Sequence, residues 1–307
     1  MRFHSLIMSI VGLPFFYVSS IQSASVVYNL RISETTKRQV RDKKYMHPRV
    51  LAVTLFDQFR KTHTETHDHI GGGLGTFIYA RELFYARVEF AAAHVRSYNN
   101  TIDYHYSRTQ TDDVLLTAGY SHILSKKTRM TFTGLVGIPT HRDTVLQGFE
   151  FGTGHVGIGA QFDSSYIYAQ SLKNSHVLMG AARIIHFFPR TVFYTITDVT
   201  TAYRYNIGNL ADLFISSSNT WGNHHTEVGY NPTFAFSASI HPDLDDVVKQ
   251  TNFIRSSFYG TYQYGFLLNN ALPIAVTFGI SYGFDHRPKL YGNKYVVTAW
   301  ISLGTTV

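Results

Sequence analysis

A short run of histidine and glutamate, "HTETHDH" at residues 63–69, has the side chains of a metal site. His63, Glu65, His67 and His69 occupy alternate positions, so in an extended segment they share one face. Imidazole and carboxylate groups of this kind bind Zn²⁺ or Cu²⁺. The same residues also suit a polar loop between two strands, because residues 61–67 separate two strand-like segments. We favour the loop and predict no metal.

The sequence shows no clear sign of catalysis. A second cluster, "NHHTE", places His224, His225 and Glu227 near a strand end, but no G-x-S-x-G motif accompanies the many serines and histidines. No helix-forming segment or lysine follows the glycine run at 71–75 to make a phosphate loop. Cysteine is absent, which excludes disulfides, thiol catalysis and thiolate metal ligands. We predict that the protein is not an enzyme and has no cofactor.

Charged side chains on strand-like segments suggest a wet interior. Arg87 and Glu89 share one face of "LFYARVEFAA", and Phe84, Val88 and Phe90 share the other. An arginine at the lipid-facing midplane of a barrel costs about 2–4 kcal/mol, whereas a wet lumen tolerates it. The same reasoning turns other polar residues inward. The predicted pore-lining residues are Arg87, Glu89, Arg129, Gln161, Asp163, Arg183 and Gln263.

These residues must be positioned by strands, because the dominant pattern of the sequence has a period of two. In "ALPIAVTFGISYGF" (271–284) the even positions are large and apolar or aromatic, and the odd positions are small and uncharged. Similar segments recur and are long enough for tilted membrane strands. The candidate strands are 49–60, 68–80, 83–96, 113–123, 128–138, 154–168, 176–188, 191–206, 209–219, 225–240, 253–268, 271–285 and 293–304.

This pattern predicts an all-β fold, a closed antiparallel transmembrane β-barrel of about 12 strands, with 14 as the alternative. Bacterial barrels have even strand numbers, so a count of thirteen must be wrong by one. Either 209–219 is not a full strand or one strand has been missed. Short connections at 80–82, 125–128, 188–190 and 269–270 contrast with long polar ones at 97–112, 139–153 and 241–252. Short turns on one side and long loops on the other are typical of barrels.

Composition favours a membrane barrel over a secreted β-sandwich or jelly roll. Charged residues make up only 15% of the sequence, whereas aromatic residues reach the same share. A sandwich exposes its outer face to water and carries lysine and carboxylates there, but the polar faces here carry mainly threonine, serine, glycine and glutamine. Aromatic residues also gather near strand ends, as in the interfacial girdles of outer-membrane barrels.

The N-terminal region differs from the rest of the protein. Arg2, an apolar run from Leu6 to Val18 and small residues at 23–25 have the layout of a secretory signal peptide. Of the 27 basic and 20 acidic residues, seven basic and two acidic ones lie between 31 and 49. With Arg2 also set aside, residues 50–307 hold 19 basic and 18 acidic ones. The positive charge therefore belongs to a tail and does not indicate nucleic-acid binding. We predict a signal peptide at 1–24, a basic periplasmic segment at 25–48 and the barrel at 49–307.

The segment "GLVGIPTHRDTVLQGFEFGTGHVGIGAQF" (134–162) resembles the strand–loop–strand of the barrel family associated with phenol-degradation operons. The matching residues are Gly137, Pro139 and Thr140 at the end of one strand, then Gly152, Thr153 and Gly154 at the start of the next. The resemblance covers about 30 residues and implies an outer-membrane channel without catalytic residues. The C-terminal sequence "WISLGTTV" departs from the terminal aromatic residue that is typical of such barrels.

Two functions remain open, with a membrane-embedded hydrolase as a third hypothesis. The first is a channel or passive transporter for small molecules, apolar compounds among them, in the bacterial outer membrane. The second is a structural or surface-exposed barrel with a plugged lumen, whose long loops bind partners. The expected partners are outer-membrane lipid and a small-molecule solute, with no nucleic acid, and the pattern does not specify an oligomeric state.

Overall fold

The computed structural model describes most residues after position 48. The described residues are 49–62, 65–81, 83–99, 104–111, 113–140, 154–171, 174–196, 199–206, 208–236, 239–242, 248–249, 253–269, 272–286 and 293–306. The expected signal peptide at 1–24 and basic segment at 25–48 lie outside these residues, as do His63, Gly152 and Thr153 of the sequence motifs.

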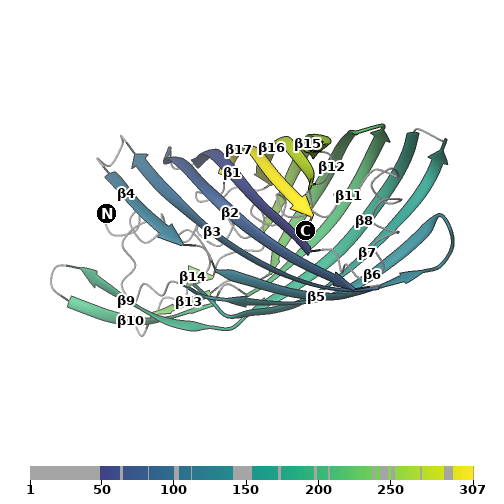
Figure 1. Ribbon diagram of the computed structural model, residues 1–307. Helices are drawn as coiled ribbons and strands as arrows, with labels where there is room; N and C mark the ends of the chain where they lie inside the picture. The colour runs from purple at the N-terminus through teal and green to yellow at the C-terminus, as the bar shows by residue number, and fades with distance from the viewer. Residues whose placement is uncertain are drawn as a thin grey trace.

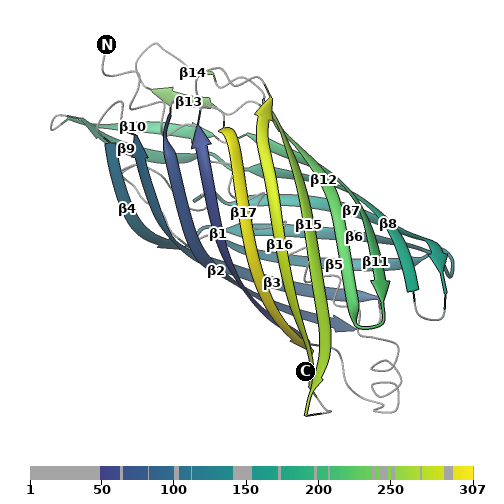
Figure 2. The same ribbon diagram turned by 90° about the horizontal axis from the view of Figure 1, so that it is seen from above.

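Twelve antiparallel strands form a closed barrel, so the predicted fold class and strand number are confirmed (Figure 1). The barrel closes where β17 pairs with β1, and β17 lies between β16 and β1 in Figure 2. The twelve strands, in sequence order, are β1 (Arg49–Thr62), β2 (His67–Arg81), β3 (Phe84–Asn99), β5 (Val114–Ile123), β6 (Thr128–Ile138), β7 (Gly157–Gln170), β8 (Asn174–Phe187), β11 (Asn209–Trp221), β12 (His224–Phe236), β15 (Phe253–Leu268), β16 (Leu272–His286) and β17 (Asn293–Thr306).

Five further strands lie outside the ring in the part of the protein that the structure describes. β4 (Tyr104–Thr111) pairs with the second half of β3, on the edge where β5 pairs with the first half. The other four form a separate small sheet in the order β14-β13-β10-β9 (Figure 1). Their bounds are β9 (Arg190–Ile196), β10 (Val199–Asn206), β13 (Ser239–Pro242) and β14 (Val248–Lys249).

The favoured number of twelve strands was correct, but the doubt about segment 209–219 was wrong. Segment 209–219 is a full barrel strand, β11, paired along its length with β8. The surplus candidate is 191–206, which is a hairpin of β9 and β10 with Ile196 opposite Val199. A two-residue hairpin leaves almost no gap in the sequence, so two short strands were interpreted as one long strand.

Other connections also differ from expectation. Residues 188–190 are not a hairpin turn, because β8 pairs with β11 and β9 begins at Arg190 in the separate sheet. The region 97–112, expected as a loop, contains the end of β3 and all of β4. Candidate 225–240 divides into β12, which ends at Phe236, and the start of β13.

The two ends of the barrel have different connections. Strands β2 and β3, β5 and β6, β7 and β8, β11 and β12, and β15 and β16 are joined by two to four residues at one end, which we call the short-turn end. The opposite, long-loop end carries β4, the small sheet and most of the longer connections. The start of β1 and the end of β17 both lie at the short-turn end, because Val50 lies opposite Thr306.

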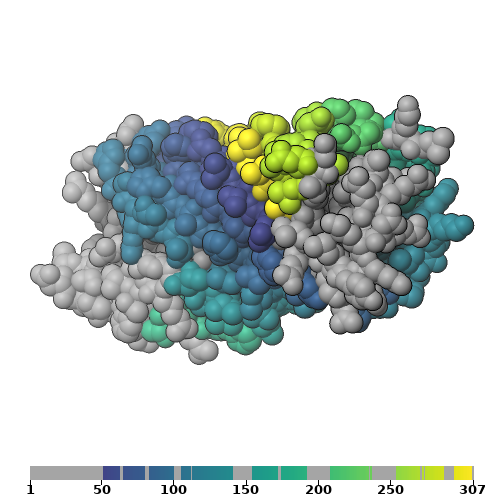
Figure 3. Space-filling view, in the orientation of Figure 1, coloured from purple at the N-terminus to yellow at the C-terminus, as the bar shows by residue number. Residues whose placement is uncertain are grey.

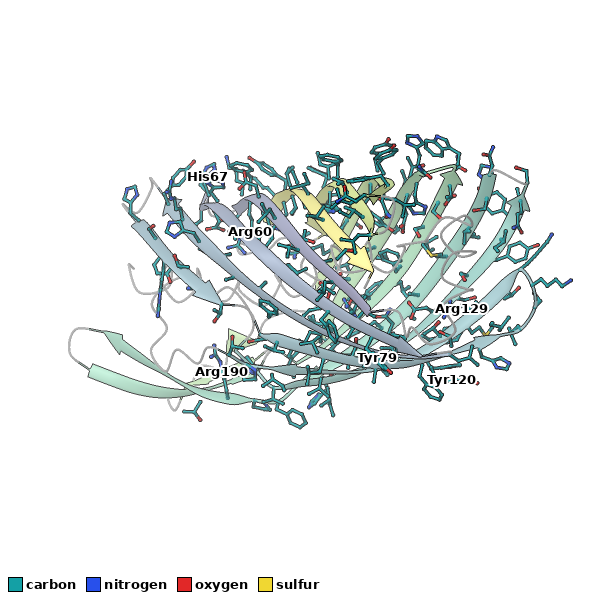
Figure 4. All side chains as sticks on the ribbon, in the orientation of Figure 1. Arg60, His67, Tyr79, Tyr120, Arg129 and Arg190 are labelled. Carbon is teal, nitrogen blue, oxygen red and sulfur yellow. The ribbon has the colours of Figure 1, made fainter. Side chains whose placement is uncertain are left out.

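Alternation of side chains separates the two faces of the wall. On β3, residues 87, 89, 91, 93, 95, 97 and 99 are buried, and the residues between them are mostly exposed. Large apolar and aromatic side chains such as Phe90, Phe132, Val228 and Ile280 are exposed on the outer surface, and Figure 4 shows Tyr120 there. The inner face is buried and rich in threonine, serine, asparagine and glutamine. No helix among the described residues is long and apolar enough to cross a membrane.

Candidate functional site: the inner face of the barrel

A charged cluster occupies the inner face of β3, β7 and β8 and contains five of the seven predicted pore-lining residues. Arg87 and Glu89 form a buried ion pair, in which the Nη2 of Arg87 lies 3.4 Å from a carboxylate oxygen of Glu89. Arg87 Nε also donates a hydrogen bond of 3.3 Å to Thr117, and Thr76 donates one of 3.4 Å to Glu89. The two charges that the sequence placed on one face therefore form a pair that neighbouring threonines hold in place.

The same cluster continues onto β7 and β8. Gln161 Nε2 donates a hydrogen bond of 2.6 Å to a carboxylate oxygen of Asp163. The Asp163 carboxylate also interacts electrostatically with Arg87 and with Arg183. Because β3 and β7 are separated by β5 and β6 in the wall, this interaction joins residues of non-neighbouring strands. Arg87, Glu89, Gln161, Asp163 and Arg183 thus form one group.

The main partner of Arg183 was missed by the sequence analysis. Arg183 forms a buried ion pair with Asp212 of β11, in which its Nε lies 2.8 Å from the carboxylate. Thr233 of β12 donates a hydrogen bond of 2.7 Å to the other oxygen of Asp212. Asp212 lies in segment 209–219, whose status as a strand was doubted, so no face could be assigned to it from the sequence.

The other two predicted pore-lining residues face inward but lie apart from this cluster. Arg129 is exposed near the short-turn end of β6, and its Nη2 donates a hydrogen bond of 2.8 Å to Ser121 of β5. Gln263 is buried on β15 directly opposite His225 of β12, and its side-chain oxygen has no hydrogen-bond partner among the described residues. The charged cluster and these two positions belong to different parts of the inner wall.

An aromatic wall faces inward on β1, β17, β15 and β11. Tyr259 and Trp300 form a buried cluster, and Phe56 and Phe214 pack against it. The rings of Phe214 and Tyr259 are stacked, with centroids 5.4 Å apart. The sequence contained this signal, since Tyr259 and Trp300 stand on the polar faces of their strands, but it was not recognised.

Glycines make room for these inward rings. A Cβ on Gly279 would collide with the indole of Trp300, and a Cβ on Gly229 would collide with the ring of Tyr259. Tyr85 crosses Gly119 of β5 in the same way, and its hydroxyl lies 2.5 Å from the hydroxyl of Thr133 on β6. A ring that lies across a glycine covers the neighbouring strand and links it laterally to the next.

The "NHHTE" histidines are divided by strand alternation. His225 and Glu227 point inward, where the hydroxyl of Tyr259 donates a hydrogen bond of 2.5 Å to Glu227. The Nε2 of His225 is 4.0 Å from Glu227 and makes no hydrogen bond with any described residue. His224 points outward and lies among aromatic rings, with Tyr264 at 5.1 Å and Trp221 at 5.6 Å between centroids.

Two further buried ion pairs lie toward the long-loop end. Arg60 of β1 pairs with Asp68 of β2, and Ser97 of β3 donates a hydrogen bond of 2.5 Å to Asp68 (Arg60 is labelled in Figure 4). Arg255 of β15 donates hydrogen bonds of 2.6 and 3.1 Å to the two carboxylate oxygens of Asp285 on β16. In both pairs the arginine and the aspartate lie directly opposite each other on neighbouring strands. Their opposite charges largely cancel inside the barrel.

The "HTETHDH" residues are placed by the structure in different settings. His67 and His69 lie on one face, as expected, but the ring of His67 stacks on Tyr98 and that of His69 on Phe59. The carboxylate of Glu65 forms ion pairs with two lysines, with its oxygens 2.5 Å from the Nζ of Lys294 and 2.6 Å from the Nζ of Lys61. Hydrogen bonds from Lys294 and then Lys61 lower the pKa of Glu65 to about 2. Within the described part of the protein, no group of three or more His, Cys, Asp or Glu side chains could hold a metal ion.

Comparisons with known proteins show the fold. No family model matches the sequence. A comparison with curated proteins also found no match. An outer membrane channel from Pseudomonas putida F1 is similar in structure, with a TM-score of 0.62 and 12% identity over 86% of this protein and 96% of the other. The transport unit of the autotransporter AIDA-I from Escherichia coli gives a TM-score of 0.53 and 9% identity over 96% of this protein and 99% of the other. The protein therefore has the fold of bacterial outer-membrane β-barrels.

Proposed function

We propose that this protein is a passive channel or transporter for small molecules in the bacterial outer membrane. An apolar outer surface and a polar inner one, on a closed barrel, are what a wall between lipid and a transport path requires. The short-turn end would then be periplasmic, as in other outer-membrane barrels. Export would use the signal peptide expected at residues 1–24. The solved structure of an outer membrane channel with a similar fold supports the proposal.

The arrangement of the inner face carries the proposal. Its charges are paired, with Arg87 beside Glu89 and Arg183 beside Asp212, so neither cations nor anions gain a large advantage. The wall formed by Phe56, Phe214, Tyr259 and Trp300 offers aromatic surface to a solute. A path with balanced charge on one side and aromatic rings on another suits small molecules with an apolar part better than simple ions. The seven predicted pore-lining residues keep that role in this proposal.

One observation favours the second candidate, a barrel with a closed lumen. Inward side chains such as Thr54, Ser121 and Thr233 are completely buried, whereas side chains that line a wide aqueous pore contact water. Small barrels fill their interiors with side chains. Such a protein would act through its surface and the long-loop end.

Two measurements separate these functions. The protein should be recovered in the outer-membrane fraction and should change mobility on a gel after boiling, because a folded barrel resists detergent until heated. Purified protein in liposomes should then admit small neutral solutes, measured by liposome swelling, and give weakly selective conductance in planar bilayers. A heat-modifiable protein that passes no solute and no current would favour the closed barrel, and recovery in the soluble fraction would contradict both functions.

A further inference from the structure

The outer surface of β1 to β4 changes character toward the long-loop end. On β3 the outward residues from Phe84 to Ala92 are apolar, but the next three are His94, Arg96 and Tyr98. The apolar part covers eight residue steps, which is about 27 Å along the strand. At a strand tilt of about 40° this corresponds to about 21 Å along the membrane normal, so the apolar part accounts for most of an apolar band of about 25 Å. His94 and Arg96 therefore lie just beyond the apolar band.

The neighbouring strands change at the same level. Arg96 lies directly opposite His69 on β2 and Ser107 on β4. One row further from the band, Tyr98 lies opposite His67 on β2 and His105 on β4. Figure 4 shows His67 at the upper rim of the barrel, and the outer surface over β1 to β4 faces the viewer in Figure 3. These residues form a continuous outward patch, which we call the rim patch: His67, His69, Arg96 and His105.

The rim patch is unlike the corresponding surface on the other side of the barrel closure. On β16 the outward residues Phe278, Ile280, Tyr282 and Phe284 remain apolar or aromatic almost to the end of the strand, where His286 follows. On β17 the outward residues are also mainly apolar up to Tyr295. Compared with β16 and β17, the nitrogen donors are therefore concentrated on β2, β3 and β4.

Contacts among these residues leave Arg96 available. Its side chain is exposed, and it makes no hydrogen bond or ion pair with any residue that the structure describes. His94 does not compete for a ligand, because its ring nitrogens lie 3.1 Å from Thr109 and 3.1 Å from Ser107 and join β3 to β4. The ring of His67 is held flat against Tyr98, with centroids 4.9 Å apart, which leaves its edge nitrogens free to donate or accept.

The nearby carboxylates are engaged by other partners. Asp57 lies 2.6 Å from the Nε2 of His69, and Glu65 is bound by Lys61 and Lys294. The guanidinium of Arg96 therefore remains without a matching anion on the described surface. A planar guanidinium with neighbouring imidazoles is suited to phosphate, which accepts two parallel hydrogen bonds from arginine.

We propose that the rim patch binds the phosphate groups of a phosphorylated lipid in the outer leaflet, with Arg96 as the main contact and His67 as an additional donor. The position just outside the apolar band is where lipid head groups lie, and the exposed positive charge complements them. This proposal concerns the outer surface and does not depend on whether the lumen conducts.

Binding can be measured by native mass spectrometry on the full barrel in detergent, titrated with lipid A that carries two phosphates and, separately, with the monophosphorylated form. We expect tighter binding of the form with two phosphates. Arg96→Gln should weaken that binding by about tenfold or more, the usual effect of losing a charge-assisted contact. His67→Gln should weaken it by a smaller factor.

Lys127→Gln is the matched control, because Lys127 is an exposed cation in the turn at the opposite end of the barrel. It should bind lipid A like the unaltered protein, and heat-dependent gel mobility would show that every variant is folded. Equal affinity of the unaltered protein and Arg96→Gln for lipid A with two phosphates would overturn the proposal. So would indifference to the number of phosphates, or an equal loss of binding in Lys127→Gln.

Discussion

The indole of Trp300 on β17 lies against the backbone of Gly279 on the neighbouring strand β16, in the space that a Cβ would need. Trp300 is 6% exposed and belongs to the aromatic wall with Tyr259. Gly279 is therefore required by a side chain on another strand and not by its own backbone conformation. The same relationship joins Tyr259 to Gly229 and Tyr85 to Gly119.

Substituting Gly279 with alanine should destabilise the barrel. The added methyl group must displace the indole, and overpacking of this kind typically costs about 1–3 kcal/mol. Unfolding in urea, followed by tryptophan fluorescence or by heat-dependent gel mobility, measures the loss. Gly134→Ala is the control, because no atom of the described residues lies within 4 Å of a Cβ placed on Gly134. It should be neutral or slightly stabilising, so equal destabilisation by both variants would contradict the role assigned to Trp300.

The Arg183–Asp212 pair should behave as a buried unit. Either Arg183→Gln or Asp212→Asn leaves one charge without its partner inside the barrel, and such a change typically costs about 3–5 kcal/mol. The double variant should recover a substantial part of that loss, since both charges are then removed. A double-mutant cycle on the free energy of unfolding gives the coupling, with exposed Arg129→Gln as a control expected to cost about 1 kcal/mol or less. Additive losses would argue against direct coupling.

The alternation of apolar and polar residues predicted the fold, because every strand of a wall with one apolar and one polar face must show this alternation. The outward Phe90 and the inward Arg87 and Glu89 could be assigned from "LFYARVEFAA" alone, since period two fixes which residues share a face. Because an arginine that faces lipid is costly, the face that carries Arg87 could then be assigned to the interior of the barrel. The same reasoning placed Gln161, Asp163 and Arg183 inward, and the structure brings these residues together.

What alternation could not predict depends on contacts between distant strands. Only two residues separate the end of β9 at Ile196 from the start of β10 at Val199, so the β9–β10 hairpin resembled one barrel strand. The pairing of Arg183 with Asp212 requires the order β8–β11, which follows only once that hairpin is removed from the wall. The sequence showed that Trp300 stands on a polar face. Its position across Gly279 follows only from the register between β16 and β17, which the sequence does not give.

Acid should loosen the contact between the β1–β2 connection and the start of β17. The bonds from Lys294 and Lys61 hold the pKa of Glu65 at about 2, below its ordinary value of 4.5. A carboxyl group with a lowered pKa in the folded state stabilises that state fully above its unfolded pKa, and the contribution disappears as the pH falls through about 2. The stability difference between the unaltered protein and Glu65→Gln should therefore be constant above about pH 5 and vanish between about pH 4.5 and 2. Urea unfolding across this range tests it, and a difference that grows on acidification would contradict the assigned sign.

Opposite substitutions in the Arg87–Glu89 pair should change ion selectivity in opposite directions. Arg87→Gln leaves Glu89 and Asp163 with less compensating positive charge, so the lumen should favour cations, whereas Glu89→Gln should favour anions. Water in a conducting lumen would screen these charges in part, so we expect changes in the permeability ratio of about two- to fivefold. Reversal potentials in a salt gradient across a planar bilayer measure the ratio.

Lys126→Gln is the control for these measurements, because it removes an exposed charge in a turn outside the inner wall and should leave the reversal potential unchanged. Shifts of the same sign in Arg87→Gln and Glu89→Gln would show that the pair does not line the path of the ions. If no variant conducts although all are heat-modifiable, the paired charges inside the wall serve to fill and stabilise a closed barrel. The opposite shifts are therefore the specific signature of a pore that passes between the charged cluster and the aromatic wall.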